Sequence, residues 1–211
     1  KQNPDALNFI VDVGMVYARE DEMDKAKSTW ESAVKAIKFE EQVFAVSNAF
    51  LAIRQYDFAI STYLKGRKVS QNHYPFSFEL ADVYKLKGEN TLMVNEYLDV
   101  LEIQDSYIQS VQNALQTSFG NEADQKLNEL LKTELLKRIA KNPDKTIFSE
   151  LLIWMQIQMK DWEGAFVQAK ALDKRKKEEG NRVMGLAQLF AQNEAYDVAI
   201  KAYNYVIAKG P

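Results

Sequence analysis

The chain has 211 residues, 46% of them hydrophobic, and a formal net charge of −3 at pH 7. This charge balance gives no reason to expect a nucleic-acid-binding surface. The sequence contains no cysteine, which excludes disulfides and any metal or catalytic site built on cysteine. No apolar run reaches the roughly 18 residues that a membrane helix needs, so we expect no direct membrane insertion of this chain.

A repeated pattern organises the chain. Residues 56–63 and 196–203 share the order Tyr-Asp-x-Ala-Ile-x-x-Tyr. When the chain is aligned on the alanines of these two segments, the steps between corresponding residues are 33, 34, 72 and 34 residues, and the long step equals one ordinary repeat plus one of 38. Such a period is typical of stacked helical repeats. The corresponding residues are Ala26, Ala59, Met93, Ala165 and Ala199.

Small and aromatic residues also recur in phase within these units. In the first unit they are Gly14, Tyr17, Ala26, Trp30 and Ala33. This spacing resembles the tetratricopeptide repeat, a helix-turn-helix unit of about 34 residues. The resemblance covers essentially the whole chain and implies an all-α fold, a right-handed α-solenoid of about six such repeats in a single array over residues 1–211. The expected repeats are about 7–39, 40–73, 74–107, 108–145, 146–179 and 180–211, with the fourth irregular and extended.

The first unit is predicted to pack its two helices closely. Gly14 lies inside the first helix, where glycine is unfavourable unless it permits the close approach of a partner helix. Residues 20–24 are predicted to form the turn into the second helix, where acidic side chains favour the positive helix N-terminus. A calcium loop is the alternative interpretation, but this segment has no glycine and no alternating ligand positions.

The second and third units follow the same plan and are joined by a longer loop. Residues 70–75 are rich in turn formers and include His73, the only histidine of the chain. We interpret this lone imidazole as a loop side chain rather than as a catalytic or metal-binding group. In the third unit Met93 stands where alanine is usual, so we expect a slightly looser helix crossing filled by a flexible side chain.

The fourth unit departs most from the pattern. Its first helix, expected at about 106–119, is rich in amide side chains. A long amphipathic stretch follows, with aliphatic residues on one side between 127 and 139, and it is predicted to stop at Asn142-Pro143 because proline disfavours the helix before it. The surplus of about four residues corresponds to roughly one helical turn. We therefore expect a helix pair whose stacking on its neighbours is altered.

The last two units return to the regular pattern. The fifth closes with the basic run 174–177, and basic residues in a last helical turn complement the helix dipole and normally lie in solvent. A nucleic-acid or anionic-membrane patch is the alternative, but Glu178 and Glu179 follow directly. The sixth unit lacks a polar capping helix and the chain begins at Lys1, so we expect a fragment of a longer bacterial array.

No motif for catalysis or cofactor binding is recognisable. The segment 180–185 has the glycine spacing of a phosphate-binding loop, but Leu186 occupies the place of the required lysine. A zincin helix needs two histidines and the chain has one. Carboxylates are scattered in the manner of solvated helix surfaces. We therefore expect no enzyme activity, no cofactor and no metal site.

The resemblance implies a non-catalytic protein–protein interaction scaffold, because in this family the first helix of each repeat lines a concave groove that holds a peptide or partner protein. One branch grips C-terminal carboxylates with lysine, asparagine and arginine. That clamp is absent, since the matching places here hold Val11, Met15, Ala45, Pro75 and Glu79.

The same geometry, carried onto this sequence, predicts which residues line the groove. Amides of the fourth unit would hydrogen-bond the backbone of an extended peptide, and Trp154 would anchor an apolar side chain. The alternative is that Trp154 packs between repeats and the amides form a solvated face. The expected groove residues are Phe44, Asn48, Phe78, Asp82, Gln109, Gln112, Asn113, Gln116, Trp154, Met184 and Gln188, and the wider projection adds Val11, Asp12, Met15, Glu79 and Glu150.

Two other functions fit the same sequence. One is a structural spacer within a cell-envelope assembly, and the other is a regulatory arm of an enzyme whose catalytic domain lies outside this chain. The envelope hypothesis places the protein in the bacterial periplasm or cell envelope, with the cytoplasm as the alternative. The sequence predicts neither the identity of the partner nor the oligomeric state.

Overall fold

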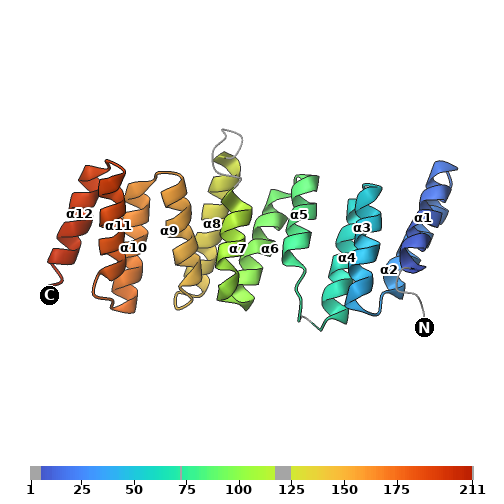
Figure 1. The fold of residues 1–211 in the computed structure, drawn as a ribbon, viewed down its shortest axis with the longest axis horizontal. Helices are drawn as coiled ribbons and strands as arrows, with labels where there is room; N and C mark the ends of the chain where they lie inside the picture. Colours follow the sequence, from blue (N-terminus) through green and yellow to red (C-terminus); the bar gives the residue numbers. More distant parts are fainter. Residues whose placement is uncertain (1–5, 72, 117–124, 211) are drawn as a thin grey trace. The chain divides into compact units, whose positions relative to one another are not determined.

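The computed structural model describes residues 6–71, 73–116 and 125–210, and all regular secondary structure in these ranges is helical (Figure 1). These ranges form twelve α-helices and one short 3-10 helix. The all-α class expected from the sequence, an α-solenoid of helix pairs, is confirmed. The chain divides into two compact units, residues 1–100 and 101–211.

Unit 1 contains helix pairs joined by short turns. Helix α1 packs against α2 and α3 packs against α4, while α1 also contacts α3, and α4 contacts α5. Each pair therefore buries its apolar faces both within itself and against the next pair. The helices are α1 (Ala6–Arg19), α2 (Met23–Ala36), α3 (Glu40–Ala52), α4 (Tyr56–Val69), α5 (Ser77–Lys87) and α6 (Asn90–Ile103), the last of which crosses the boundary between the units.

Unit 2 begins less regularly and then repeats the same plan. Helix α9 packs against α10 and α11 against α12, while α8 contacts α9, and α10 contacts both α11 and α12. The elements are the 3-10 helix η1 (Asp105–Tyr107), α7 (Ile108–Gln116), α8 (Gln125–Lys141), α9 (Ile147–Gln158), α10 (Trp162–Lys176), α11 (Asn181–Gln192) and α12 (Tyr196–Ile207).

In the fourth expected repeat, the predicted end of the second helix agrees with the structure, whereas the predicted start of the first helix does not. Helix α8 ends at Lys141, directly before Asn142-Pro143, as predicted. The amide-rich helix was expected from about 106, but residues 105–107 form a 3-10 turn and the α-helix begins at Ile108. Its expected end near 119 lies outside the described residues. The division of the chain into six repeats stays a prediction.

The first helix pair is held together by a tryptophan packed onto a glycine. Trp30 on α2 is 1% exposed, and its indole Nε1 donates a hydrogen bond to the carbonyl oxygen of Val11 on α1 at 3.0 Å. A Cβ atom added to Gly14 would lie 2.2 Å from that Nε1, closer than any real contact. The expected close approach of the two helices at Gly14 is therefore confirmed. The rings of Phe58 and Phe50, with centroids 5.3 and 6.3 Å from that of Trp30, extend the same cluster into the second pair.

The turns inside the helix pairs repeat one backbone geometry. In each of five turns, one residue has a positive φ, and the amide of the following residue donates to the carbonyl five residues earlier at 2.8 or 2.9 Å. This is the Schellman arrangement that ends a helix with a left-handed residue. The positions are 33 or 34 residues apart within each unit, although only one of them is glycine. They are Asp21, Arg54 and Gly88 in unit 1, and Lys160 and Glu194 in unit 2.

Two glycines, one in a turn with positive φ and one inside a helix, allow the effect of backbone conformation on stability to be measured without a change in packing. Gly88 has φ +74 and Gly185 lies in helix α11. A Cβ added to either would have no described atom beyond the local backbone within 4 Å. We expect Gly88→Ala to lower the free energy of unfolding by about 1 kcal/mol because alanine disfavours the left-handed region. Gly185→Ala should raise it by about 0.5–1 kcal/mol because alanine favours a helix. Urea melts measure both changes, and effects of the same sign would contradict this account of the turns.

The tryptophan at the first helix crossing is expected to dominate the stability of its pair. We expect Trp30→Ala to lower the free energy of unfolding by about 3–5 kcal/mol, because a large buried ring is replaced by a cavity. Tyr196→Ala is the control, since the Tyr196 side chain is 60% exposed, and its change should stay within about 0.5 kcal/mol. Denaturant melts of both variants test the assignment, and a loss below about 1 kcal/mol for Trp30→Ala would refute it.

Candidate functional site

The predicted groove residues lie on the first helices of successive pairs. In unit 1 they are on α3 and α5, and in unit 2 they are on α7, α9 and α11. One member of the wider projection is wrong: Val11 is fully buried beneath Trp30 and cannot contact a partner.

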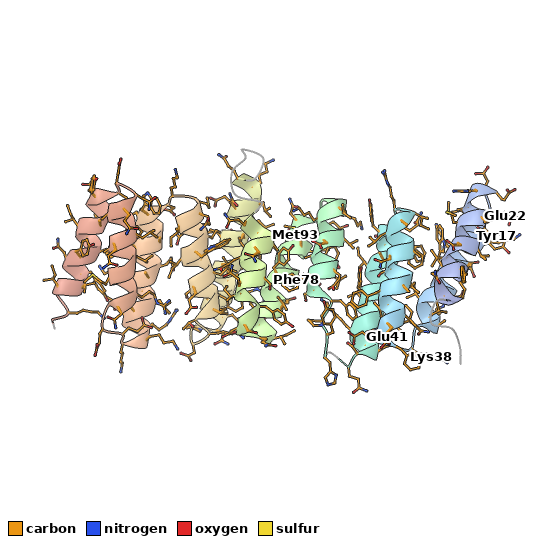
Figure 2. All side chains as sticks on the ribbon, in the orientation of Figure 1. Tyr17, Glu22, Lys38, Glu41, Phe78 and Met93 are labelled. Atoms are coloured by element: carbon orange, nitrogen blue, oxygen red, sulfur yellow. The ribbon has the colours of Figure 1, made fainter. Side chains whose placement is uncertain are left out.

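In unit 1 the predicted residues surround a group of aromatic rings. We call Phe44, Asn48, Phe78, Glu79 and Asp82 the α3–α5 surface. Asn48 and Asp82 are exposed, Phe44 is 36% exposed, and Phe78 and Glu79 are half-buried. Phe78, on α5, is labelled in Figure 2. This surface therefore combines accessible apolar rings with polar and acidic groups.

The aromatic contacts of this surface hold its rings in place. The Phe44 ring lies 5.4 Å from that of Phe76 and 6.2 Å from that of Tyr74, both in the segment that leads into α5. The Phe78 ring lies 5.9 Å from that of Tyr97 on α6. Because each ring is packed on at least one partner, a ligand would meet preorganised apolar groups rather than flexible ones.

Arg67 on α4 fixes the loop that places helix α5. Its Nε donates to the carbonyl oxygen of Pro75, and its Nη2 donates to Ser77 Oγ at 3.2 Å and pairs with the carboxylate of Glu96 on α6. Glu96 is only 8% exposed. At the N-cap of α5, Phe76 is fully buried with φ +50. The loop and the start of α5 are thus held by a buried ion pair together with a buried ring.

The carboxylates of the α3–α5 surface are poorly compensated. Tyr74 donates its hydroxyl proton to Glu79 Oε1 at 2.7 Å, while Glu79 Oε2 is buried with no hydrogen-bond partner among the described residues. Neither Glu79 nor Asp82 forms an ion pair with any residue that the structure describes. Desolvation is the largest cause that raises the pKa of Asp82, Lys85 opposes it, and the negative charge of Glu79 adds to it. This surface is therefore short of positive charge.

Two tyrosines next to these carboxylates report the same electrostatic environment. Burial, together with the charge of Asp82, raises the pKa of Tyr97 to about 12. Burial also raises the pKa of Tyr63, a hydrogen bond with Ser47 lowers it, and the charges of Glu79 and Asp82 raise it further. Both tyrosines occupy in-phase aromatic positions of the repeat, so the sequence indicated core packing and gave no sign of their proximity to the acids.

In unit 2 the predicted amide wall is partly hydrogen-bonded to itself. Gln109 Nε2 donates to Asn113 Oδ1 at 2.9 Å along α7, and Gln116 Nε2 donates to Gln158 Oε1 on α9 at 3.0 Å. Trp154 on α9 is half-buried, so part of its side chain is exposed to solvent. These contacts occupy donors and acceptors of the amide side chains that would otherwise be available to the backbone of an extended peptide. The other predicted residues of this unit are Gln112 and Met184, which are half-buried, and Gln188, which is exposed.

The described ranges contain neither a metal-binding cluster of side chains nor a membrane-spanning helix. No group of three or more histidine, cysteine, aspartate or glutamate side chains in these ranges is placed to hold a metal ion. Within the same residues, no helix combines the length and the apolar character needed to cross a bilayer. The turn at 20–24, for which a calcium loop was the alternative, ends in α2 with Asp24 in its first turn, where a carboxylate stabilises the helix N-terminus.

Comparisons with known proteins add little. No protein-family model matches the sequence, and no curated protein matches it. Among solved structures, the chain is similar to a tetratricopeptide repeat protein from Parabacteroides merdae ATCC 43184, with 11% sequence identity and a TM-score of 0.36. That match covers 100% of this chain and 81% of the other. A likeness this distant assigns no function, so the fold described above rests on the helix pairs themselves.

The buried ion pair behind the α3–α5 surface makes a strong prediction about stability. Arg67→Ala leaves the Glu96 carboxylate buried without a partner, and we expect a loss of about 3 kcal/mol in the free energy of unfolding. The double variant Arg67→Met, Glu96→Leu should lose less, because no uncompensated charge remains. Urea melts compare the two.

A matched control for this test is the exposed pair of Lys25 with Glu22, at 2.8 Å in the same unit. We expect Lys25→Ala to change the free energy of unfolding by less than about 1 kcal/mol, because exposed ion pairs contribute little. A loss of the same size for Lys25→Ala and Arg67→Ala would show that burial of Glu96 is not what makes Arg67 important.

Proposed function

We propose that this chain is a non-catalytic protein-interaction module and that it binds a basic segment of a partner protein on the α3–α5 surface. The helix pairs act as a rigid scaffold, and the exposed side chains of their first helices make the contacts. The proposal includes membership of the tetratricopeptide repeat family, supported by the in-phase small and aromatic residues and by the Schellman turns 33 or 34 residues apart.

The observation that carries the proposal is the uncompensated carboxylate of Glu79. Its Oε2 is buried and has no hydrogen-bond partner in the part of the chain that the structure describes, and the neighbouring Asp82 has a raised pKa. A buried polar atom without a partner is unfavourable by about 1–3 kcal/mol. A lysine or arginine side chain of a bound peptide would supply the missing positive charge beside Glu79 and the exposed Asp82.

The apolar groups of the same surface indicate the rest of the ligand. Phe78 is on α5 together with the two acids, and the Phe44 ring packs near Tyr74, whose hydroxyl bonds to Glu79. Asn48 adds an exposed amide. Buried aromatic anchors surrounded by polar groups are typical of binding hot spots. We therefore expect a segment in which a basic residue stands next to an apolar one. In unit 2, Trp154 and the amides of α7 form a second proposed contact region of the same module.

An unbiased selection tests this function. Random peptides displayed on phage are selected against the wild-type protein and counter-selected against the variant Glu79→Gln, Asp82→Asn. We expect enrichment of peptides with lysine or arginine beside an apolar residue. Calorimetry with the most enriched peptide should then show at least about tenfold weaker binding to the variant, equivalent to about 1.4 kcal/mol.

The control variant is Glu20→Gln, Asp21→Asn, which removes the same number of charges from the exposed turn between α1 and α2. It should bind the selected peptide as the wild type does. Asparagine tolerates the positive φ of Asp21, so the turn is preserved. Enriched peptides without basic residues, or equal weakening by both variants, would contradict the assignment of the α3–α5 surface.

A further inference from the structure

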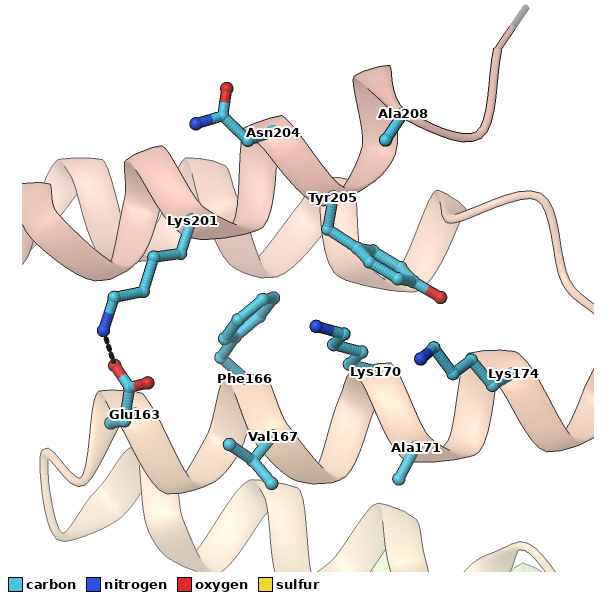
Figure 3. A pocket seen from close by; sticks show the side chains of 10 residues that line it. All are labelled: Glu163, Phe166, Val167, Lys170, Ala171, Lys174, Lys201, Asn204, Tyr205 and Ala208. Carbon is cyan, nitrogen blue, oxygen red and sulfur yellow. Dashed lines mark hydrogen bonds and ion pairs between the residues drawn. The ribbon is translucent and has the colours of Figure 1, made fainter.

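An open hollow lies between helices α10 and α12 of unit 2 (Figure 3). It has a volume of about 850 Å³ and lies between the second helices of two successive pairs, not on the first-helix face that the family resemblance implies. This volume is within the range of ligand pockets in proteins. Its lining comes from α10 with Glu163, Phe166, Val167, Lys170, Ala171 and Lys174, and from α12 and the residue after it with Lys201, Asn204, Tyr205 and Ala208.

A buried aspartate fixes one wall of the hollow. Asp173 on α10 is fully buried, and it accepts hydrogen bonds from the Tyr205 hydroxyl at 2.6 Å and from the Gly180 amide at 2.9 Å, and pairs with Lys209. Burial by itself would raise the pKa of Asp173, but the bonds from Lys209, Tyr205 and Gly180 outweigh it and hold that pKa below its usual value. The Tyr205 ring is therefore held in a defined position.

Two lysines bring uncompensated positive charge to this hollow. The Lys170 ammonium lies 5.6 Å from the centroid of the Phe166 ring and 5.3 Å from that of Tyr205. Ring contacts of this kind attract a cation but leave its charge in place. In the part of the chain that the structure describes, neither Lys170 nor Lys174 forms an ion pair, whereas Lys201 pairs with Glu163 at 2.8 Å. The hollow thus carries a net positive charge within a unit rich in both signs.

Apolar groups lie between these charges. Val167 is 50% exposed, and Ala171 and Ala208 are also exposed. Figure 3 shows the Phe166 and Tyr205 rings and the end of Lys170 between the two helices. A ligand that fits this lining carries negative charge on an apolar body.

We infer that the α10–α12 hollow binds an acidic peptide segment, with carboxylates on Lys170 and Lys174 and an apolar side chain over Val167 and Ala171. Lys170 and Lys174 are one helical turn apart, so their Cβ atoms are about 6 Å apart and both side chains are on the same face of α10. Charges in a row match successive acidic residues of a peptide. A single phosphate is better matched by the planar fork of arginine, and none of the described residues that line the hollow is an arginine.

This inference goes beyond the proposed function. It concerns another unit, another pair of helices and a ligand of opposite charge to the one proposed for the α3–α5 surface. Because the variants that test it leave Glu79 and Asp82 unchanged, either proposal can fail while the other holds.

The experiment is a fluorescence anisotropy titration of the whole chain at low ionic strength. The probe is a short fluorescein-labelled peptide of alternating glutamate and leucine, and the same peptide with glutamine in place of glutamate is the charge control. We expect binding of the acidic peptide only. The variant Lys170→Gln, Lys174→Gln should bind it about tenfold more weakly. Val167→Glu, which puts a carboxylate on the wall at an exposed position, should weaken it to a similar degree.

The matched control is Lys126→Gln, Lys177→Gln, which removes two exposed lysines of the same unit that are not among the residues lining the hollow. It should bind the acidic peptide within about twofold of the wild type. Methyl resonances of Val167, Ala171 and Ala208 should shift on titration. Equal weakening by both lysine pairs, binding of the glutamine peptide, or shifts confined to other residues would overturn the inference.

Titrations with inorganic phosphate and with vesicles containing phosphatidylserine complete the experiment. We expect neither to compete with the acidic peptide. If phosphate or the vesicles bind and displace the peptide through Lys170 and Lys174, the hollow is a phosphate or membrane site and the inference is wrong.

Discussion

The structure depends on small residues that receive large side chains where helices cross. Trp30 packs where Gly14 leaves room, and a Cβ atom on Gly66 would lie 2.7 Å from the Phe76 ring and 2.9 Å from Val43. The first contact joins α1 to α2, and the second joins α4 to α3 and to the start of α5. The distance between the helices at one crossing therefore restricts the packing at the next. Since the inward faces make these packing contacts, the side chains on the outward faces are less constrained by the packing of the core.

Those outward faces differ in charge between the units. Among the described residues, Glu79 and Asp82 of the α3–α5 surface form no ion pair, and neither do Lys170 and Lys174 of the α10–α12 hollow. A formal net charge of −3 conceals this contrast, because opposite excesses on separate surfaces cancel in the sum. The low net charge therefore described the whole chain well but was a poor guide to any single surface.

The sequence was sufficient to predict features that depend on local pattern. Ala26, Ala59 and Ala199 are buried at the places that the repeat implies, and the close approach at Gly14 followed from a glycine inside a helix. The repeated left-handed turn was not predicted, because Arg54, Lys160 and Glu194 carry no local signal for positive φ, and the glycine at position 88 does not recur in the other turns. The ion pair of Arg67 and Glu96 was not predictable either, because it joins residues 29 positions apart on different helices. Lys174 was interpreted as part of a solvated basic run, and the sequence did not single out Lys170, because only the fold shows which rings lie beside it.

The buried carboxylate of Asp173 has a consequence for the dynamics of unit 2. Through Tyr205 and Lys209 it ties the end of α12 to α10, while α11 lies between them in the chain. In a simple repeat array each pair interacts with its neighbour mainly through apolar surface, and a terminal helix can open by itself. Here the opening of the last turn of α12 would remove Tyr205 and Lys209 from the buried carboxylate of Asp173. Local opening is therefore coupled over three helices, and α10, α11 and α12 should exchange their amide hydrogens as one cooperative unit.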